Sequence, residues 1–107
     1  MSDPGQERRA TGRVNVRSQV WLGRDGVFTH AAERLLNLGH AGAFVETDKR
    51  HAVHSVLNMR FSLGADVITS TVIVRSVGPR GIGVEFLDLL QEDRERIAAF
   101  IAHEQQS

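Results

Sequence analysis

Two arginines four positions apart are the residues of this chain best suited to binding an anion. Arg9 and Arg13 bracket the sequence RATGR near the N-terminus. A guanidinium group is a planar fork of N–H donors, which can hold a phosphate or the edge of a guanine with two parallel hydrogen bonds. Charged residues near a chain terminus are more often part of a solvated arm. The pair alone therefore leaves two interpretations, a basic arm or a site for a small polyanion.

A second segment, Asn37–Gly42 with the sequence NLGHAG, has residues suited to contact with a nucleotide. The amide of Asn37 can donate to and accept from the edge of a base. Glycine allows close approach to backbone N–H groups, and Gly42 would leave room for a ligand. A plain turn between two strands explains Asn and Gly equally well, because both favour turn geometry.

In this order, the two segments resemble the ligand signature of the PilZ domain family. That signature is Arg-x-x-x-Arg, followed by Asp or Asn, any residue, Ser, two of any residue and Gly. Arg9, Arg13, Asn37 and Gly42 match it, whereas Gly39 stands where the family has Ser. The stretch GIGVEFLD at 81–88 also resembles the last strand of PilZ domains and the start of their helix. The resemblance covers nearly the whole chain, from about residue 8 to residue 100.

The resemblance implies an all-β fold with one helix, namely a six-stranded antiparallel PilZ-type β-barrel followed by a C-terminal α-helix. It also implies binding of the bacterial second messenger cyclic di-GMP, with no cofactor and no metal. Arg9 and Arg13 would be the primary ligands, and Asn37, Gly39 and Gly42 would complete the site. In the family, an arginine at the position of Arg8 accompanies binding of a stacked pair of ligand molecules.

Gly39 is the departure from the family pattern that bears on affinity. The Ser hydroxyl is missing, although the backbone N–H remains. Losing one hydrogen bond to a polar or charged ligand costs roughly 1–3 kcal/mol, which is about ten- to hundredfold in affinity. Two functions follow. One is a stand-alone cyclic di-GMP receptor that signals to an unidentified output protein. The other is a degenerate interaction module without nucleotide, for example in motility, biofilm or type IV pilus control.

Composition narrows the class of protein. The chain has 107 residues, 41% hydrophobic and 24% charged, which is typical of one globular domain. It has no cysteine, no apolar stretch long enough to cross a membrane and no secretory signal core at its N-terminus. A cytoplasmic protein without membrane insertion is therefore expected. No Ser–His–Asp order or paired carboxylates stand out, so an enzyme is not expected.

The net charge is zero, but the acidic and basic residues are unevenly distributed along the chain. Residues 1–24 carry five Arg and two acids, whereas residues 85–107 carry six acids and two Arg. A basic arm on a neutral body suits a small polyanion better than DNA or RNA, whose binders usually show a broad basic face with stacking aromatics. His51 and His54 offer only two imidazoles, which is too few for a metal site.

Hydrophobic alternation predicts the elements that position these residues. Residues 1–13 are expected to form a flexible arm and residues 14–104 a single barrel domain. Period-two patterns predict strands at 14–22, 57–63, 67–77 and 82–86, with turns at Asp25-Gly26, Gly64–Asp66 and Gly78–Gly81.

Two segments of the chain have the local character of a helix. The stretch 31–36, AAERLL, followed by Gly39, has the local character of a helix, but the family resemblance makes it a strand, and we follow the resemblance. The C-terminal segment is predicted to be a helix near residues 90–103. Asp88 is expected to cap it, and Ile97, Phe100 and Ile101 are expected to form its apolar face.

Overall fold

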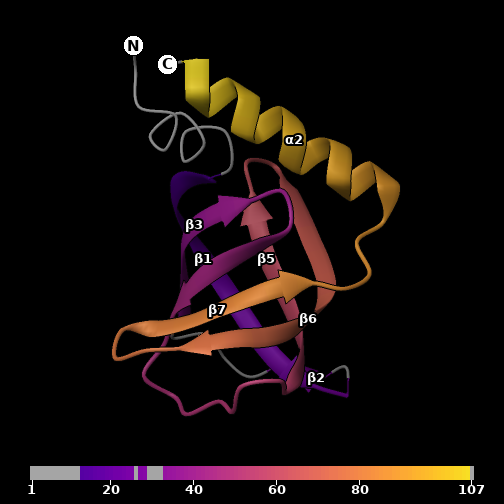
Figure 1. Ribbon diagram of the computed structural model, residues 1–107. Helices are drawn as coiled ribbons and strands as arrows, with labels where there is room; N and C mark the ends of the chain where they lie inside the picture. The colour runs from indigo at the N-terminus through magenta and orange to yellow at the C-terminus, as the bar shows by residue number, and fades with distance from the viewer. Residues whose placement is uncertain (1–12, 26, 29–32, 107) are drawn as a thin grey trace.

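The computed structural model describes residues 13–25, 27–28 and 33–106 of the chain. Its elements, in chain order, are β1 (Arg13–Arg24), β2 (Val27–Phe28), β3 (Glu33–Gly39), β4 (Gly42–Glu46), β5 (Val56–Leu63), β6 (Asp66–Val77), β7 (Gly81–Phe86) and the helix α2 (Gln91–Gln106). Six strands form an antiparallel barrel in the order β1-β3-β4-β7-β6-β5, which closes where β5 pairs with β1 (Figure 1). The prediction of a six-stranded barrel with a C-terminal helix is confirmed.

The predicted turns lie where the sequence placed them. Asp25 adopts a φ of 55° in the hairpin that joins β1 to the short β2. Gly64 adopts a φ of 63° between β5 and β6, in the left-handed region that glycine enters without steric cost. Gly78 donates its N–H to the carbonyl of Gly81 over 2.9 Å and so closes the β6–β7 turn.

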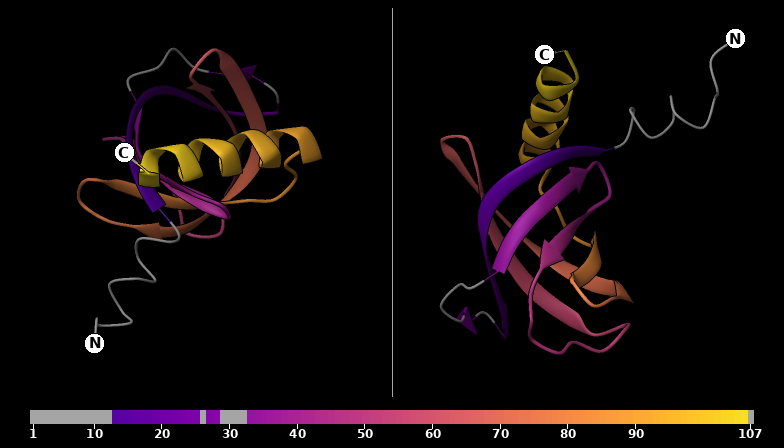
Figure 2. Two further views of the ribbon diagram at one scale, coloured as in Figure 1. Left: turned by 90° about the horizontal axis from the view of Figure 1, so that it is seen from above. Right: turned by 90° about the vertical axis from the view of Figure 1, so that its left-hand side faces the viewer.

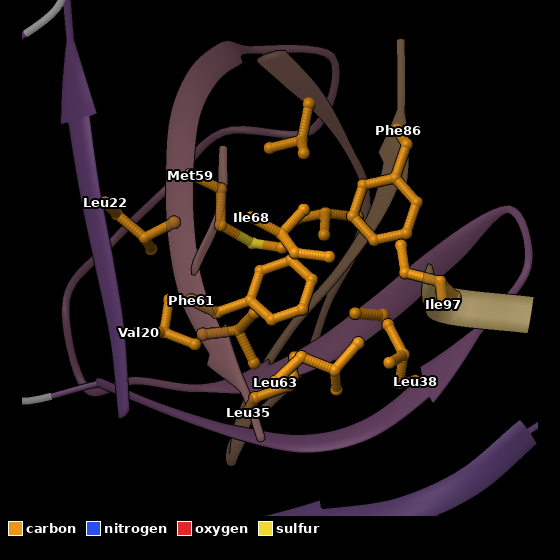
Figure 3. Close-up of a cluster of buried hydrophobic side chains, with 14 of the residues drawn as sticks. Val20, Leu22, Leu35, Leu38, Met59, Phe61, Leu63, Ile68, Phe86 and Ile97 are labelled. Carbon is orange, nitrogen blue, oxygen red and sulfur yellow. The ribbon is translucent and has the colours of Figure 1, made fainter. Parts of the chain in front are cut away.

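The barrel interior is filled by the alternate side chains of its strands. On β5, Leu57, Met59, Phe61 and Leu63 are all buried, which confirms the cleanest alternation in the sequence. Figure 3 shows this cluster, in which the rings of Phe61 and Phe86 stack with centroids 6.2 Å apart. Burying one such side chain contributes roughly 1.5–3 kcal/mol to the free energy of folding. The inward-facing side chains of the six strands therefore supply most of the stabilisation.

The helix α2 lies across one end of the barrel, as the view from above in Figure 2 shows. Its side chains Ile97 and Ile101 are each 1% exposed, and Phe100 packs partly buried against the same core. The predicted apolar face is therefore confirmed. No helix in the described part of the chain is both long enough and apolar enough to span a bilayer.

The expected capping role of Asp88 is wrong. The helix begins at Gln91, and the carbonyl of Leu90 accepts from the N–H groups of Asp93 and Arg94. Asp88 instead lies before the helix and accepts hydrogen bonds from the Thr71 N–H (2.6 Å), the Thr71 hydroxyl (2.9 Å) and the Ser70 hydroxyl (3.1 Å). Its carboxylate therefore fastens the β7–α2 connection to β6 rather than satisfying the first turn of the helix.

The segment with helical character forms a strand, as the resemblance implied. Residues 29–32 lie outside the described part of the chain, and β3 runs from Glu33 to Gly39. Its pairing with β4 shifts register between Leu35 and Asn37, which makes Leu36 an extra residue in the ladder. Leu35 and Leu38 are consequently both fully buried although they are three apart. A β-bulge thus produces the spacing that imitates a helix.

Candidate ligand-binding site

Arg13, the last residue of the arginine segment, and Asn37, the first residue of the second segment, lie on neighbouring strands. Arg13, the first residue of β1, lies directly opposite Gly39, the last residue of β3, and Asn15 lies opposite Asn37. The guanidinium of Arg13 reaches diagonally along the pair and donates from Nη1 to Oδ1 of Asn37 over 2.5 Å. Diagonal cross-strand neighbours are within reach of long side chains. The antiparallel register therefore joins the arginine motif to the Asn37–Gly42 segment.

The other predicted arginines, Arg8 and Arg9, lie outside the described residues, as does most of the predicted arm at 1–13. Arg13 is the exception, because it is the first residue of β1 and pairs with Gly39 of β3. The fold thus fixes the backbone of the second signature arginine, and its exposed side chain points away from the core that begins at Val14.

A second bulge shapes the strand beside this contact. Between the pairs Asn15–Asn37 and Ser18–Leu35, two residues of β1, Val16 and Arg17, face the single residue Leu36 of β3. The bulge leaves a hollow of about 390 Å³ at the surface, lined by residues 15–17 and 36. Bulges often occur beside functional sites because they redirect side chains that a regular ladder would fix.

Arg13, Asn15 and Arg17 form an exposed polar row on β1, and the family signature includes only the first of them. Asn15 and Arg17 were not predicted as site residues. Alternation along β1 indicates that residues 13, 15 and 17 are exposed, but only the pairing with β3 shows that Asn15 lies opposite Asn37. We call this exposed row, together with Asn37, the β1–β3 face. It offers two guanidinium groups and two amides, and none of its members is acidic.

The two glycines of the Asn37–Gly42 segment are both buried. A Cβ at Gly42 would lie 2.1 Å from the carbonyl oxygen of Val84, so close packing of β4 on β7 already requires glycine. Gly39 belongs to β3 and is not among the described glycines with a positive φ. The segment is therefore mostly strand, with only His40 and Ala41 forming an exposed turn.

Metal binding finds no support in the described residues. Within ranges 13–25, 27–28 and 33–106, no group of three or more His, Cys, Asp or Glu side chains is placed to hold a metal ion. Some of the acidic and basic side chains in this part of the chain pair with each other. Arg75 contacts Glu85 at 2.6 Å on the surface, and Arg96 contacts the buried Asp93 at 2.8 Å. An exposed pair such as Arg75–Glu85 contributes little to stability.

The chain matches the model of the PilZ domain family over residues 7–103 and belongs to that family. The inhibitor of motility MotI/DgrA from Bacillus subtilis has a similar fold, with a TM-score of 0.75 and 15% sequence identity. The match covers 89% of this chain and 50% of MotI/DgrA, so this chain spans half the length of that protein.

An uncharacterised protein from Legionella has a TM-score of 0.56 and 12% identity, over 88% of this chain and 94% of its own. At these identities the two structures show a shared fold. No curated protein sequence matches the chain.

Proposed function

We propose that this PilZ domain binds cyclic di-GMP on the β1–β3 face and passes the signal to another protein. The observation that carries the proposal is the hydrogen bond between Arg13 and Asn37, since it joins two parts of the family's ligand signature in one place. The proposal implies a cytoplasmic location, where a bacterial second messenger acts.

The chemistry of the face suits this ligand. Cyclic di-GMP carries two phosphates and two guanines, whose edges and flat rings are natural partners for guanidinium groups. The contact with Asn37 orients the guanidinium of Arg13 and occupies only one edge, which leaves other N–H donors for a phosphate or a base. Arg17 would provide a second charge on the same face. Arg9, from the signature, and Arg8, which precedes it, would add further positive charge to this face.

Calorimetric titration with cyclic di-GMP tests the proposal. The parent protein is expected to bind saturably, and Arg13→Ala is expected to weaken binding by about 1.5–3 kcal/mol, the range for a charged hydrogen bond. Arg80→Ala is the matched control, because Arg80 is equally exposed but lies in the β6–β7 turn. Equal affinity of Arg13→Ala and the parent would place the ligand elsewhere and reject the β1–β3 face.

A second candidate function is an interaction module that does not bind the nucleotide. Gly39 favours it, because the position directly opposite Arg13 lacks the hydroxyl of the family signature. Absence of any heat of binding in the parent would select this function.

Either function needs an output protein. MotI/DgrA is an inhibitor of motility by name, and control of motility is accordingly the first output to test. Swimming of cells that carry the Arg13→Ala protein is the readout. The nucleotide-receptor function predicts that these cells behave like cells lacking the protein.

A further inference from the structure

The end of the barrel away from α2 carries a hollow that the proposed function does not use. It lies around β2, at the opposite end of β1 from Arg13 (Figure 1). Its volume is about 310 Å³, at the lower limit for small-molecule sites, which are roughly 300–1,000 Å³. We call it the end hollow.

The walls of the end hollow are apolar. Leu22 and Leu57 form the buried part and are 3% and 2% exposed. Val27 forms the outer wall and is 69% exposed, so its aliphatic side chain faces water as the structure stands. A ligand in the hollow would cover this surface and gain roughly 25 cal/mol per Å² of apolar area removed from water.

The outer wall is held in place without a ligand. A Cβ at Gly23 would lie 1.7 Å from the carbonyl oxygen of Val27, so glycine at this position lets β2 pack closely on β1. The guanidinium of Arg60 lies over the ring of Phe28 at 4.5 Å and fixes the residue that follows Val27. The hollow is therefore preformed, which lowers the ordering cost of binding.

The polar side of the end hollow is basic. Arg24, Lys49 and His51 line it, and no acidic residue is among the described residues that do so. Asp25 lies beyond Arg24, in a neighbouring hollow. Apolar walls with two cationic side chains at the rim complement a molecule that has an apolar body and a single anionic group.

We propose that the end hollow binds a small amphiphilic anion, namely a carboxylate with a short alkyl or aryl body. The volume of about 310 Å³ lies at the lower limit for small-molecule sites, so a short apolar body suits it. The apolar body lies against Leu22, Val27 and Leu57, and the carboxylate accepts hydrogen bonds from Arg24 and Lys49. This proposal is independent of cyclic di-GMP, because the two sites lie at opposite ends of β1.

Octanoate, octan-1-ol and octylammonium form a probe series that separates charge from apolar contact. Each is titrated into the 107-residue protein without cyclic di-GMP, while the amide resonances of Gly23, Val27 and Leu57 are followed. Octanoate is expected to bind saturably and to shift these resonances, with octylammonium at least about tenfold weaker, the equivalent of one charged contact. Absence of a saturable shift with octanoate, or equal affinity for octylammonium, would overturn the proposal.

A second experiment reverses the charge of the two cationic side chains at the rim of the hollow. The double variant Arg24→Glu, Lys49→Glu is expected to bind octanoate at least about tenfold more weakly and octylammonium more tightly. The double variant Arg80→Glu, Arg94→Glu is the control, since it makes the same total charge change at two exposed residues that do not line the hollow. If the double variant melts at a lower temperature than the parent, Lys49→Gln is used in its place. Its affinity for octanoate is expected to be about threefold or more below that of the parent. Unchanged octanoate binding in these variants would overturn the proposal.

The apolar wall is tested with Val27→Ser, a change at an exposed position. Octanoate and octan-1-ol are both expected to bind a few-fold more weakly, in proportion to the lost apolar contact. Sedimentation is measured alongside. If octanoate does not bind the parent, and the parent forms a dimer that Val27→Ser abolishes, then a second copy covers the hollow and the small-anion proposal is wrong.

Discussion

The β5–β6 ladder and the strands around β3 pair with different regularity. From the Val56–Ile73 pair to the Leu63–Asp66 pair, β5 stays in one register with β6 over the whole length of β5. By contrast, β3 shifts register against β1 and again against β4, and both shifts fall at or next to Leu36. The regular ladder contributes Phe61, whose ring stacks on Phe86 of β7, whereas the irregular strands carry the exposed Arg13 and its contact with Asn37.

The difference indicates that the regularly paired strands serve mainly to form the core, whereas the bulged strands serve mainly to present exposed side chains. A regular ladder alternates strictly, so it buries every second side chain and favours stability. A bulge interrupts the alternation, so that a few side chains no longer point strictly toward or away from the core. In this protein the freed positions lie next to Asn37, where the family signature expects ligand residues. The predictions below test that division, starting with the largest effect.

Phe61→Ala should have the largest effect, and that effect should be on stability. Phe61 is fully buried and stacks on Phe86, so its truncation is expected to lower the free energy of unfolding by about 3–5 kcal/mol. Urea denaturation measures this loss. Phe61→Leu keeps more of the volume and should leave a folded protein whose cyclic di-GMP affinity equals that of the parent. Weakened binding by Phe61→Leu would show that the regular ladder also shapes the site.

Asp88→Ala should lower the free energy of unfolding by about 1–2 kcal/mol at neutral pH, because three donors on β6 lose their shared acceptor. The hydrogen bond from the Thr71 N–H lowers the pKa of Asp88 in the folded protein below its usual value. The contribution is therefore present above the unfolded-state pKa of about 3.9 and is lost as the pH falls through the lower folded-state pKa. The stability difference between parent and variant should shrink in acid.

Asp48→Ala serves as the control for this prediction, since Asp48 is an exposed acid in the connection after β4. A loss in Asp88→Ala that is the same at neutral and acidic pH would contradict a role for the ionised carboxylate.

The contrast between regular and bulged pairing also explains which elements could be predicted from the sequence. On β5, alternation from Leu57 to Leu63 predicted both the strand and its buried face, because nothing interrupts the ladder. At β3, the residues AAERLL at 31–36 have the local character of a helix, and only the family resemblance predicted the strand that pairs there. Asp88 was misassigned for a related reason. An acid shortly before a helix resembles a cap, and its partners on β6 are distant in sequence.

The site was predictable in part. The signature identified Arg13 and Asn37, and the structure joins them. It did not identify Asn15 or Arg17, because their place beside Asn37 depends on the register of β1 with β3. Gly42 was expected to make room for a ligand, but the space that its missing Cβ leaves is taken by the carbonyl of Val84. Local sequence does not reveal such contacts between strands.

Arg17→Ala should weaken cyclic di-GMP binding by about 1.5 kcal/mol through loss of a charged contact on the β1–β3 face. The residue is exposed, so the free energy of unfolding should change by less than about 0.5 kcal/mol. Arg94→Ala, on the exposed side of α2, is the matched control for overall charge. Equal losses in the two variants would mean that Arg17 acts only through net charge.

Gly39→Ser should produce the smallest effect and a gain, by about 1 kcal/mol in binding. The hydroxyl would be restored directly opposite Arg13, at a position in a regular strand conformation that Ser adopts without backbone strain. Calorimetry and thermal melting should be carried out on the same preparation. An unchanged melting temperature without any gain in affinity would show that the missing hydroxyl is not what limits binding.

The most direct test of the account is a double-mutant cycle for cyclic di-GMP binding with Arg13→Ala, Asn37→Ala and the combined variant. If Asn37 orients Arg13 for the ligand, the loss in the combined variant should be smaller than the sum of the single losses. A coupling energy of about 0.5–3 kcal/mol is typical of residues in contact. Strictly additive losses, or no binding by the parent protein, would contradict the claim that the bulged β1–β3 pair forms one ligand site.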